Sequence, residues 1–464
     1  MPISPLAAVQ ELLKRSTVLG DSASETIAYL MDLLYYGEFQ IFEQVASTED
    51  FDYINLVGIK GQATQEPPLW LVSNLSTGGL PVPSNWESTG GNPYAPTVDE
   101  EHGMLYGLGA ASGKVDLLLK LLAASRFRSE ELIRPIYVVA MLGDEGRSTG
   151  IRSLLGMAHT VGGCALLGAP TNLNIWTEHP GVLAFDVAIH RRVRHRRMPP
   201  TRGIFELEIT GATSHAQVRE LGDDALEKAR DTITRLREAG DIRILSIQAG
   251  GHGIQVPGSC KLCVATGYDD LPPLPEGVTS RPMPDGAVVP FPIDDMVGAW
   301  FDATAESIEK ISPLLRSGAW GDLAQPPVLS HIGSLDSERD AIHGSLLFWT
   351  PPGVSTQEIA ETVAGALERR LAREEELEGA IRVIQDRKAL SPTADSKFLA
   401  ATKDALRDID IPPSVSQGYV TTDAGLLMEA GVQALAFGPG TGVNTIYRDN
   451  ESMPVAHIEA CYRF

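Results

Sequence analysis

The apolar run "LWLV" at 69–72 is followed directly by the polar segment "SNLS" at 73–76 and a Gly-Gly turn. Such a run predicts a buried strand, and strand ends that open into glycine-rich loops are where α/β proteins place catalytic and binding groups. The groups offered here are the Asn74 amide and the Ser76 hydroxyl, which can hydrogen-bond a polar ligand. The stretch is therefore either an active site or the place of a former one, with Asn74 and Ser76 as its polar groups.

Asp144 and Glu145 are adjacent acids directly after a second apolar run, "IRPIYVVAML" at 133–142. At the end of a buried strand, a carboxylate can act as general acid or base toward a bound molecule. The alternative is structural, because acids at the start of a helix stabilise its positive end. We expect Glu145 and Asp144 to be catalytic.

Other side chains are candidates for the same pocket. Ser112 lies two residues before Lys114, a spacing that could form a Ser–Lys nucleophile pair. Tyr447 could donate a proton or only fill space. His215, in "GATSHA", is on its own more often structural than catalytic. The loop "GPGTG" at 438–442 lacks the following Lys-Ser/Thr of a phosphate loop and predicts a turn.

The elements that position these residues alternate between strand and helix up to about residue 180. Strands are expected at 51–61, 67–76, 133–142 and 164–170, the first two paired with each other, and helices at 5–15, 22–46, 113–127 and 148–161. This alternation predicts a doubly wound, mostly parallel α/β sheet with helices on both faces.

The pattern changes near residue 180 and returns after about 388. Between these points, alternating strands accompany one helix that stops at Gly240 and another opened by a Ser355–Glu358 capping box. Two helices on an antiparallel sheet predict an inserted α+β lid and dimerisation domain. We expect this domain at 180–388, with a Pro-rich insertion near 268–295, and the catalytic-type α/β domain at 1–179 and 389–464.

Composition excludes several classes of function. The chain has 464 residues, enough for two domains, and its 60 acidic and 38 basic residues give a net charge of −22, which argues against a nucleic-acid partner. No apolar run is long enough to cross a bilayer, and no leader is recognisable at the start, so we expect a cytoplasmic protein without a membrane partner. The Arg-rich segment 191–202 is either an exposed basic hairpin or an anion or subunit contact.

The four cysteines do not suggest a disulfide framework. Cys260 and Cys263 have the spacing of metal ligands, but they lie in an expected strand and no second pair exists. We therefore expect no structural zinc at this pair.

Six motifs occur in a definite order: "SNLSTGG", "YGLGAASGK", "GDEGRSTG", "GAPTNLNI", "TGATSHA" and "FGPGTGVNTIYRDNE". Their order and wording resemble the di-zinc amidohydrolases of the aminoacylase, acetylornithine deacetylase and succinyl-diaminopimelate desuccinylase type, in peptidase clan MH. The resemblance covers nearly the whole chain and implies the same two-domain fold. In that family a carboxylate bridges two zinc ions, and a Glu takes a proton from metal-bound water.

Most ligand positions of that family carry other residue types in this chain. The family's His-x-Asp, bridging Asp, Gly-Glu-Pro-Thr acid and last His fall on Asn74 and Ser76, Ser112, Ala169 and Tyr447, and the following Asn-Glu keeps Asn450 and Glu451. The replacements are neutral, and all but Ala169 can hydrogen-bond. We therefore expect no metal or other cofactor, and a polar ligand bound by Asn74, Ser76, Ser112, Tyr447 and Asn450.

The family's Asp-Glu-Glu motif can be matched in two registers. Aligned on Ser148, Asp144 takes the base position and Glu145 a ligand position; shifted by one, Glu145 is the base and Gly146 takes the ligand position. His215 matches a family histidine that stabilises the oxyanion in a partner subunit, and Gln255 stands near the family's lid asparagine. The resemblance thus implies a homodimer through the inserted domain.

Three functional hypotheses follow from the sequence. The first, which we favour, is a metal-independent enzyme acting by general acid–base catalysis on an acyl-amino-acid-like or peptide-like small molecule, with the reaction left open among acyl transfer, cyclisation, isomerisation, elimination and hydrolysis. The second is a catalytically inactive binding or scaffold protein. The third is a zinc-dependent amidohydrolase with rearranged ligands.

Overall fold

A computed structural model describes most of the chain. The described residues are 4–18, 21–47, 52–62, 66–77, 85–142, 148–157, 162–192, 202–250, 253–284, 290–318, 320, 328–391, 396–442 and 448–464. Contacts divide the chain into two compact units. The first comprises Met1–Gly181, Trp320–Gln325 and Arg387–Phe464, and the second comprises Val182–Ala319 and Pro326–Asp386.

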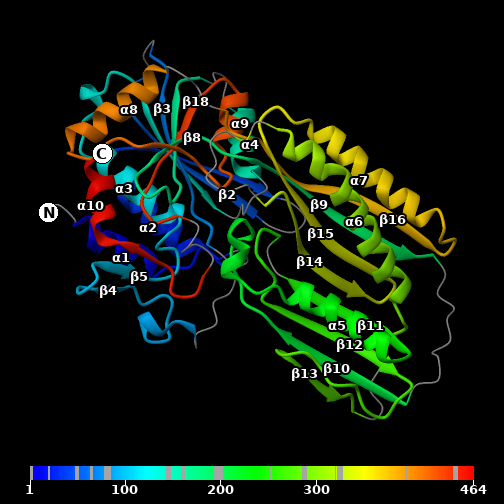
Figure 1. Ribbon diagram of the computed structural model, residues 1–464. Helices are drawn as coiled ribbons and strands as arrows, with labels where there is room; N and C mark the ends of the chain where they lie inside the picture. The colour runs from blue at the N-terminus through cyan, green and yellow to red at the C-terminus, as the bar shows by residue number, and fades with distance from the viewer. Residues whose placement is uncertain are drawn as a thin grey trace. The chain divides into compact units, whose positions relative to one another are not determined.

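The first unit is built on an eight-stranded sheet in the order β1-β2-β6-β3-β7-β18-β8-β17 (Figure 1). Its strands are β1 Gln40–Ser47, β2 Asp52–Lys60, β3 Leu69–Asn74, β6 Ile136–Leu142, β7 Cys164–Leu167, β8 Ile175–Glu178, β17 Val415–Gln417 and β18 Gln433–Ala436. A small second sheet has the order β19-β5-β4, from β4 Thr97–Asp99, β5 Met104–Tyr106 and β19 Ser452–Pro454. β3 is parallel to β6 and β7, and β7 is parallel to β18, which confirms the mostly parallel α/β class.

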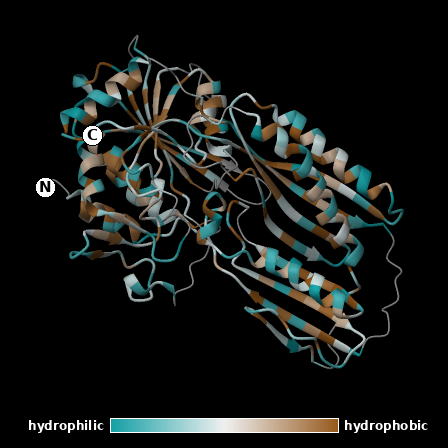
Figure 2. Cartoon of the chain, viewed as in Figure 1, coloured by the Kyte–Doolittle hydropathy of each residue, from teal (hydrophilic) through white to brown (hydrophobic). Residues whose placement is uncertain are grey.

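Helices cover both faces of the large sheet. They are α1 Pro5–Leu13, α2 Ser24–Tyr36, α3 Gly113–Ala124, α4 Thr149–Met157, α8 Lys397–Asp408, α9 Ala424–Glu429 and α10 Val455–Arg463. On one face Leu12, Leu118 and Ile458 belong to a single buried cluster, and on the other face Ile151 and Leu427 belong to a second. Figure 2 shows hydrophobic residues along the strands and hydrophilic residues on the outward sides of the helices.

Two expectations about the first unit were wrong. The helix expected over 22–46 ends at Tyr36, and Gln40–Ser47 is instead strand β1, paired residue by residue with β2. The strands β2 and β3 are not neighbours, because β6 lies between them. Both errors concern pairing partners distant in sequence, which local periodicity does not reveal.

The second unit contains an eight-stranded sheet in the order β13-β10-β12-β11-β14-β15-β9-β16. Its strands are β9 Gly181–Arg191, β10 Gly203–Thr210, β11 Ile242–Gly250, β12 Ser259–Thr266, β13 Val278–Pro282, β14 Ser330–Glu338, β15 Ala341–Thr350 and β16 Leu377–Arg387. Helix α5 Ala225–Ala239 lies over β10, β11 and β12, whereas α6 Asp294–Arg316 and α7 Thr356–Leu371 lie over the other half of the sheet (Figure 1). Asp224 and Ser355 cap α5 and α7.

The second unit contains more helices and strands than the sequence predicts. Only two helices were expected there, but α6 is a third, with β14 after it, and β13 lies inside the Pro-rich segment. Helix α6 is fixed by Trp300, whose Nε1 donates to the carbonyl of Val187 at 2.9 Å and whose ring fills the space left by the missing side chain of Gly344. Among the described residues, no helix is long and apolar enough to span a membrane.

Candidate functional site

Four parallel strands of the first unit end side by side. β6, β3, β7 and β18 are neighbours in the sheet, so their carboxyl ends share one edge, which is where open α/β sheets bind ligands. Asn74 is the last residue of β3, Ala169 follows β7, and Gly438 follows β18. We call this region, together with the loop 107–112, the carboxyl edge.

Asn74 and Ser76 form the turn after β3. The Asn74 Oδ1 accepts a hydrogen bond from the Ser76 N–H at 2.9 Å, as in an Asx turn. Helix α3 begins directly against this turn, because a Cβ on Gly113 would lie 2.3 Å from the Asn74 carbonyl oxygen. The Ser76 Oγ is buried and has no hydrogen-bond partner among the described residues, so it is a polar atom that a ligand can satisfy.

Ser112 is the N-cap of α3. Its Oγ donates to the Gly109 carbonyl at 2.8 Å and accepts from the Lys114 N–H at 3.2 Å. The Lys114 Nζ donates instead to the Arg15 carbonyl. The Ser–Lys nucleophile pair considered from the spacing is therefore not formed, and the Ser112 hydroxyl stabilises the start of the helix.

Glu451 binds the backbone of the loop that precedes α3. It is fully buried, and its carboxylate accepts from the Gly109 N–H at 2.7 Å and from the Ala111 N–H at 3.0 Å. Burial raises the pKa of the Glu451 carboxyl to about 7 and lowers the pKa of the buried Lys114 amine to about 7, although the two charges attract each other. Glu451 is therefore a structural anchor of the carboxyl edge.

Asn450 is engaged in the same region. Its backbone has a φ of 58°, in the left-handed conformation that Asn tolerates. Its Oδ1 accepts from the Ser88 N–H at 2.9 Å, and its Nδ2 donates to the Asn85 carbonyl at 2.8 Å. The side chain thus ties the segment 85–88 to the chain around Glu451.

A buried ion pair lies beneath the edge. Lys120 Nζ and Asp116 Oδ2 are 2.6 Å apart on successive turns of α3, and the Ser73 hydroxyl donates to the same oxygen at 2.5 Å. A Cβ on Gly168 would lie 2.2 Å from Asp116 Oδ2, and one on Gly438 would lie 2.9 Å from Asp116 Oδ1. Glycine at the ends of β7 and β18 therefore leaves room for this carboxylate.

A second polar cluster forms around Ser148 and Asp423. Ser148, with a φ of 57°, donates from its Oγ to Asp423 Oδ1 at 2.5 Å, and Arg387 Nε lies 3.5 Å from the same oxygen. Nearby, the Nε2 of buried His179 lies 2.8 Å from the Thr422 hydroxyl, and burial lowers the pKa of His179 to about 4. The contact with Asp423 fixes Ser148 at the start of α4.

His215 belongs to the second unit. Its Nδ1 accepts from the Gln217 N–H at 3.2 Å, so a neutral ring carries its proton on Nε2. The backbone around His215 pairs with that around Gln255, and the Nε2 of buried His331 lies 2.9 Å from the Gln255 carbonyl. The local structure therefore presets one tautomer of His215 and braces the segment that bears it.

The structure brings together Asn74, Ser76, Ser112 and Asn450 around the loop 107–112, with Ala169 at the same edge. It places His215 in the other unit, and Asp144, Glu145 and Tyr447 lie outside the described residues. Within the described ranges, no group of three or more His, Cys, Asp or Glu side chains is arranged to hold a metal ion. Cys260 and Cys263 are buried in strand β12, and burial raises the pKa of their thiols to about 12 and 11.

Sequence reasoning missed Asp116, Lys120 and the anchoring role of Glu451. A signal existed for the first two, because two opposite charges four residues apart interrupt an otherwise apolar helix at 115–121. No comparable signal marks Glu451, whose partners lie 340 and 342 residues earlier in the chain.

Comparisons with known sequences find similarity over large parts of the chain. The peptidase family M20/M25/M40 matches residues 80–464. An acetylornithine deacetylase from Pectobacterium carotovorum is 27% identical over 184 residues, which are 39% of this chain and 45% of that protein. A probable carboxypeptidase from Aspergillus fumigatus is 21% identical over 260 residues, 52% of each chain. The chain thus spans about half or less of the curated relatives that it matches, from 29% to 52%.

Solved structures share the fold over the full length. The dipeptidase Dug1p from Saccharomyces cerevisiae has a TM-score of 0.59 at 11% identity, covering 99% of this chain and 93% of that chain. The M20 family metallo-carboxypeptidase Sso-CP2 from Sulfolobus solfataricus has a TM-score of 0.58 at 13% identity, covering 99% and 97%. At these identities the likeness concerns the fold alone.

Proposed function

This chain belongs to the peptidase family M20/M25/M40, and from that membership we propose that it acts on a small acyl-amino-acid-like or peptide-like molecule without a di-zinc centre. The substrate would bind at the carboxyl edge, where Ser76 offers a buried hydroxyl without a partner among the described residues. General acid–base catalysis would fall to Asp144 and Glu145.

The proposal rests on what the side chains at the family's ligand positions are bonded to in this chain. The Asn74 Oδ1 is engaged by the Ser76 N–H, and the Ser112 Oγ caps α3, while Ala169 has no donor atom. Zinc in proteins needs imidazole, thiolate or carboxylate ligands. The described residues at these positions do not fit a pair of zinc ions.

The chemistry left to the chain is proton transfer and hydrogen bonding. A carboxylate at 144 or 145 would take a proton from the attacking group and return it to the leaving group, a role that contributes about 10²–10⁴-fold to a rate. His215, with its proton on Nε2, would donate a hydrogen bond to a substrate oxyanion or carboxylate. Because this histidine lies in the inserted unit, we propose that a homodimer brings it to the site, as the family resemblance implies.

Metal analysis and two isosteric substitutions test this function. The purified chain is expected to hold fewer than one zinc ion and to convert members of a panel of N-acyl amino acids and dipeptides after dialysis against a chelator. Glu145→Gln or Asp144→Asn should lower the rate about 100-fold, whereas the exposed acids in Glu459→Gln and Asp408→Asn serve as matched controls. Two zinc ions per chain, or full activity in both 144 and 145 variants, would contradict the proposal.

A second candidate is a binding protein without catalysis. It is favoured by the same local bonds, because Glu451, Asn450 and Ser112 keep the edge ordered by contacts within the chain alone. Saturable binding of a panel member without turnover, unchanged by Glu145→Gln, would support this alternative over the enzyme.

A further inference from the structure

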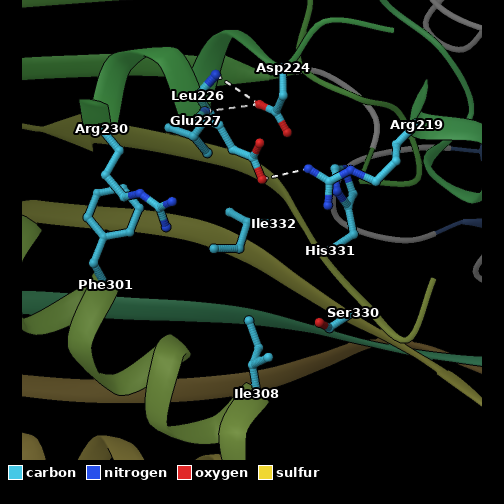
Figure 3. Close-up of a pocket in the computed structure, with 10 residues that line it drawn as sticks. All are labelled: Arg219, Asp224, Leu226, Glu227, Arg230, Phe301, Ile308, Ser330, His331 and Ile332. Atoms are coloured by element: carbon cyan, nitrogen blue, oxygen red, sulfur yellow. Dashed lines mark hydrogen bonds and ion pairs between the residues drawn. The ribbon is translucent and has the colours of Figure 1, made fainter. Parts of the chain in front are cut away.

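A small pocket opens in the second unit between α5, α6 and β14, with a cavity volume of about 140 Å³ (Figure 3). We call it the lid pocket. One side is apolar, formed by Leu226, Phe301, Ile308 and Ile332. All of its lining residues belong to the second unit, so it shares no residue with the carboxyl edge.

The lid pocket contains a guanidinium without a counter-ion among the described residues. Arg219 and Arg230 both line it, but Arg219 is neutralised by Glu227, whose Oε1 lies 2.6 Å from Arg219 Nη2. No hydrogen bond or ion pair links the Arg230 guanidinium to another described residue, and Figure 3 draws none between Arg230 and the other lining residues.

Asp224 supplies the opposite charge with one oxygen to spare. Its Oδ1 accepts from the Leu226 N–H at 2.9 Å and from the Glu227 N–H at 3.2 Å, which caps α5. Its Oδ2 makes no hydrogen bond with the described residues, and burial raises the pKa of this carboxyl. A cation placed beside Oδ2 would offset that cost of burial.

His331 adds a neutral acceptor. A carbonyl only accepts, so the 2.9 Å contact with the Gln255 carbonyl puts the ring proton on Nε2. Burial lowers the pKa of His331 to about 4, and the ring is therefore neutral at pH 7. Its Nδ1 has no partner among the described residues and remains an acceptor for a donor in the pocket.

We propose that the lid pocket binds a free α-amino acid with a branched aliphatic or aromatic side chain. The carboxylate pairs with Arg230, a charge-assisted contact for which the planar guanidinium is suited. The ammonium donates to Asp224 Oδ2 and His331 Nδ1, and the side chain lies against Phe301, Ile308 and Ile332. Two opposite charges beside an apolar wall match an amino acid of this kind. A simple anion or a hydrocarbon would use only one part of the pocket. This inference is independent of the proposed function.

Calorimetric titration of the full chain with L-leucine and L-phenylalanine tests the proposal, because it needs no turnover. Saturable binding is expected for both. Leucinamide lacks the carboxylate, N-acetyl-leucine lacks the ammonium and glycine lacks the side chain, so each should bind at least 10-fold more weakly than leucine.

Three variants locate the binding. Arg230→Met and Asp224→Asn should each weaken leucine binding at least 10-fold, and the amide oxygen introduced by Asp224→Asn would still cap α5. Arg235→Met is the matched control, since Arg235 is exposed on the same helix and does not line the pocket; it should leave affinity unchanged. Absence of saturable leucine binding, leucinamide binding as tight as leucine, or binding unaffected by both pocket variants would overturn the proposal.

Discussion

The carboxyl edge and the lid pocket use their polar side chains differently. At the carboxyl edge, the chain's own backbone forms hydrogen bonds with the side chains of Ser112, Asn450 and Glu451. In the lid pocket, Arg230 and His331 Nδ1 have no partner among the described residues. Polar groups that are satisfied internally stabilise the fold, whereas unsatisfied ones remain available to a ligand. Substitution of Ser112, Asn450 or Glu451 should therefore affect stability, whereas substitution of Arg230 should affect binding.

The largest expected effect lies beneath the edge. Lys120→Met leaves the Asp116 carboxylate buried without its cation and should lower the free energy of unfolding by about 3–5 kcal/mol. Adding Asp116→Asn removes the uncompensated charge and should recover more than half of that loss. Urea denaturation measures both, with exposed Lys397→Met as the control. A Lys120→Met variant as stable as the parent would show that the pair is not structural.

The next effect is a pH dependence at Glu451. An unfolded glutamate titrates near 4.3, whereas the pKa of Glu451 in the fold is about 7. Between these values the folded chain holds a proton that the unfolded chain has lost, so this group's contribution to stability falls as pH rises. The free energy of unfolding should drop by about 1–3 kcal/mol between pH 5 and 7, relative to Glu451→Gln.

The same measurement extended above pH 7 isolates Lys114. Its pKa is lowered to about 7 in the fold, below the roughly 10.4 of an unfolded lysine. The unfolded chain then binds the extra proton, so this contribution rises with pH above 7. Parallel pH profiles for the parent chain and Glu451→Gln from pH 5 to 7 would refute the raised pKa of Glu451.

A smaller effect is expected at Ser112. Ser112→Ala removes the cap of α3 and should cost about 1 kcal/mol, whereas Ser112→Asp keeps a capping oxygen and should change stability by less than about 0.5 kcal/mol. Ser112→Asp also places a carboxylate at the position where the family resemblance implies a bridging acid. We expect it to take up less than one zinc ion per chain by mass spectrometry, because Asn74 and Ala169 remain. If this variant bound one or more zinc ions per chain, the residue type at position 112 alone would decide whether the chain binds zinc.

The smallest effect on stability is expected in the lid pocket. Arg230→Met removes an exposed side chain without a partner among the described residues and should change the free energy of unfolding by less than about 0.5 kcal/mol. Leucine affinity should nonetheless fall. If thermal unfolding shows a large loss of stability instead, Arg230 is part of the architecture, and the contrast between the two regions disappears.

Local sequence was sufficient wherever one segment decides its own structure. The buried strands β3, β6 and β7 are continuous apolar runs, and the cap at Ser355 follows from its spacing to Glu358, whose N–H donates to the Ser355 Oγ at 3.2 Å. Local sequence failed at β1, read as the end of a helix, because its partner β2 determines it. It also failed at α6, whose position depends on the fit of Trp300 against Gly344.

For the site, the sequence by itself determined which residue types stand at the carboxyl ends of the strands, and in which order. Positions 74, 112 and 169 therefore carry Asn74, Ser112 and Ala169, none of which has an imidazole or a carboxylate. Only the tertiary structure decided what these groups do. The Ser112 hydroxyl bonds Gly109 and Lys114, which are near it in sequence. The loop that carries it is held by the Glu451 carboxylate, which accepts from the Gly109 N–H 342 residues earlier in the chain. Hydrogen bonds act over about 3 Å in space, and separation along the chain does not encode that distance.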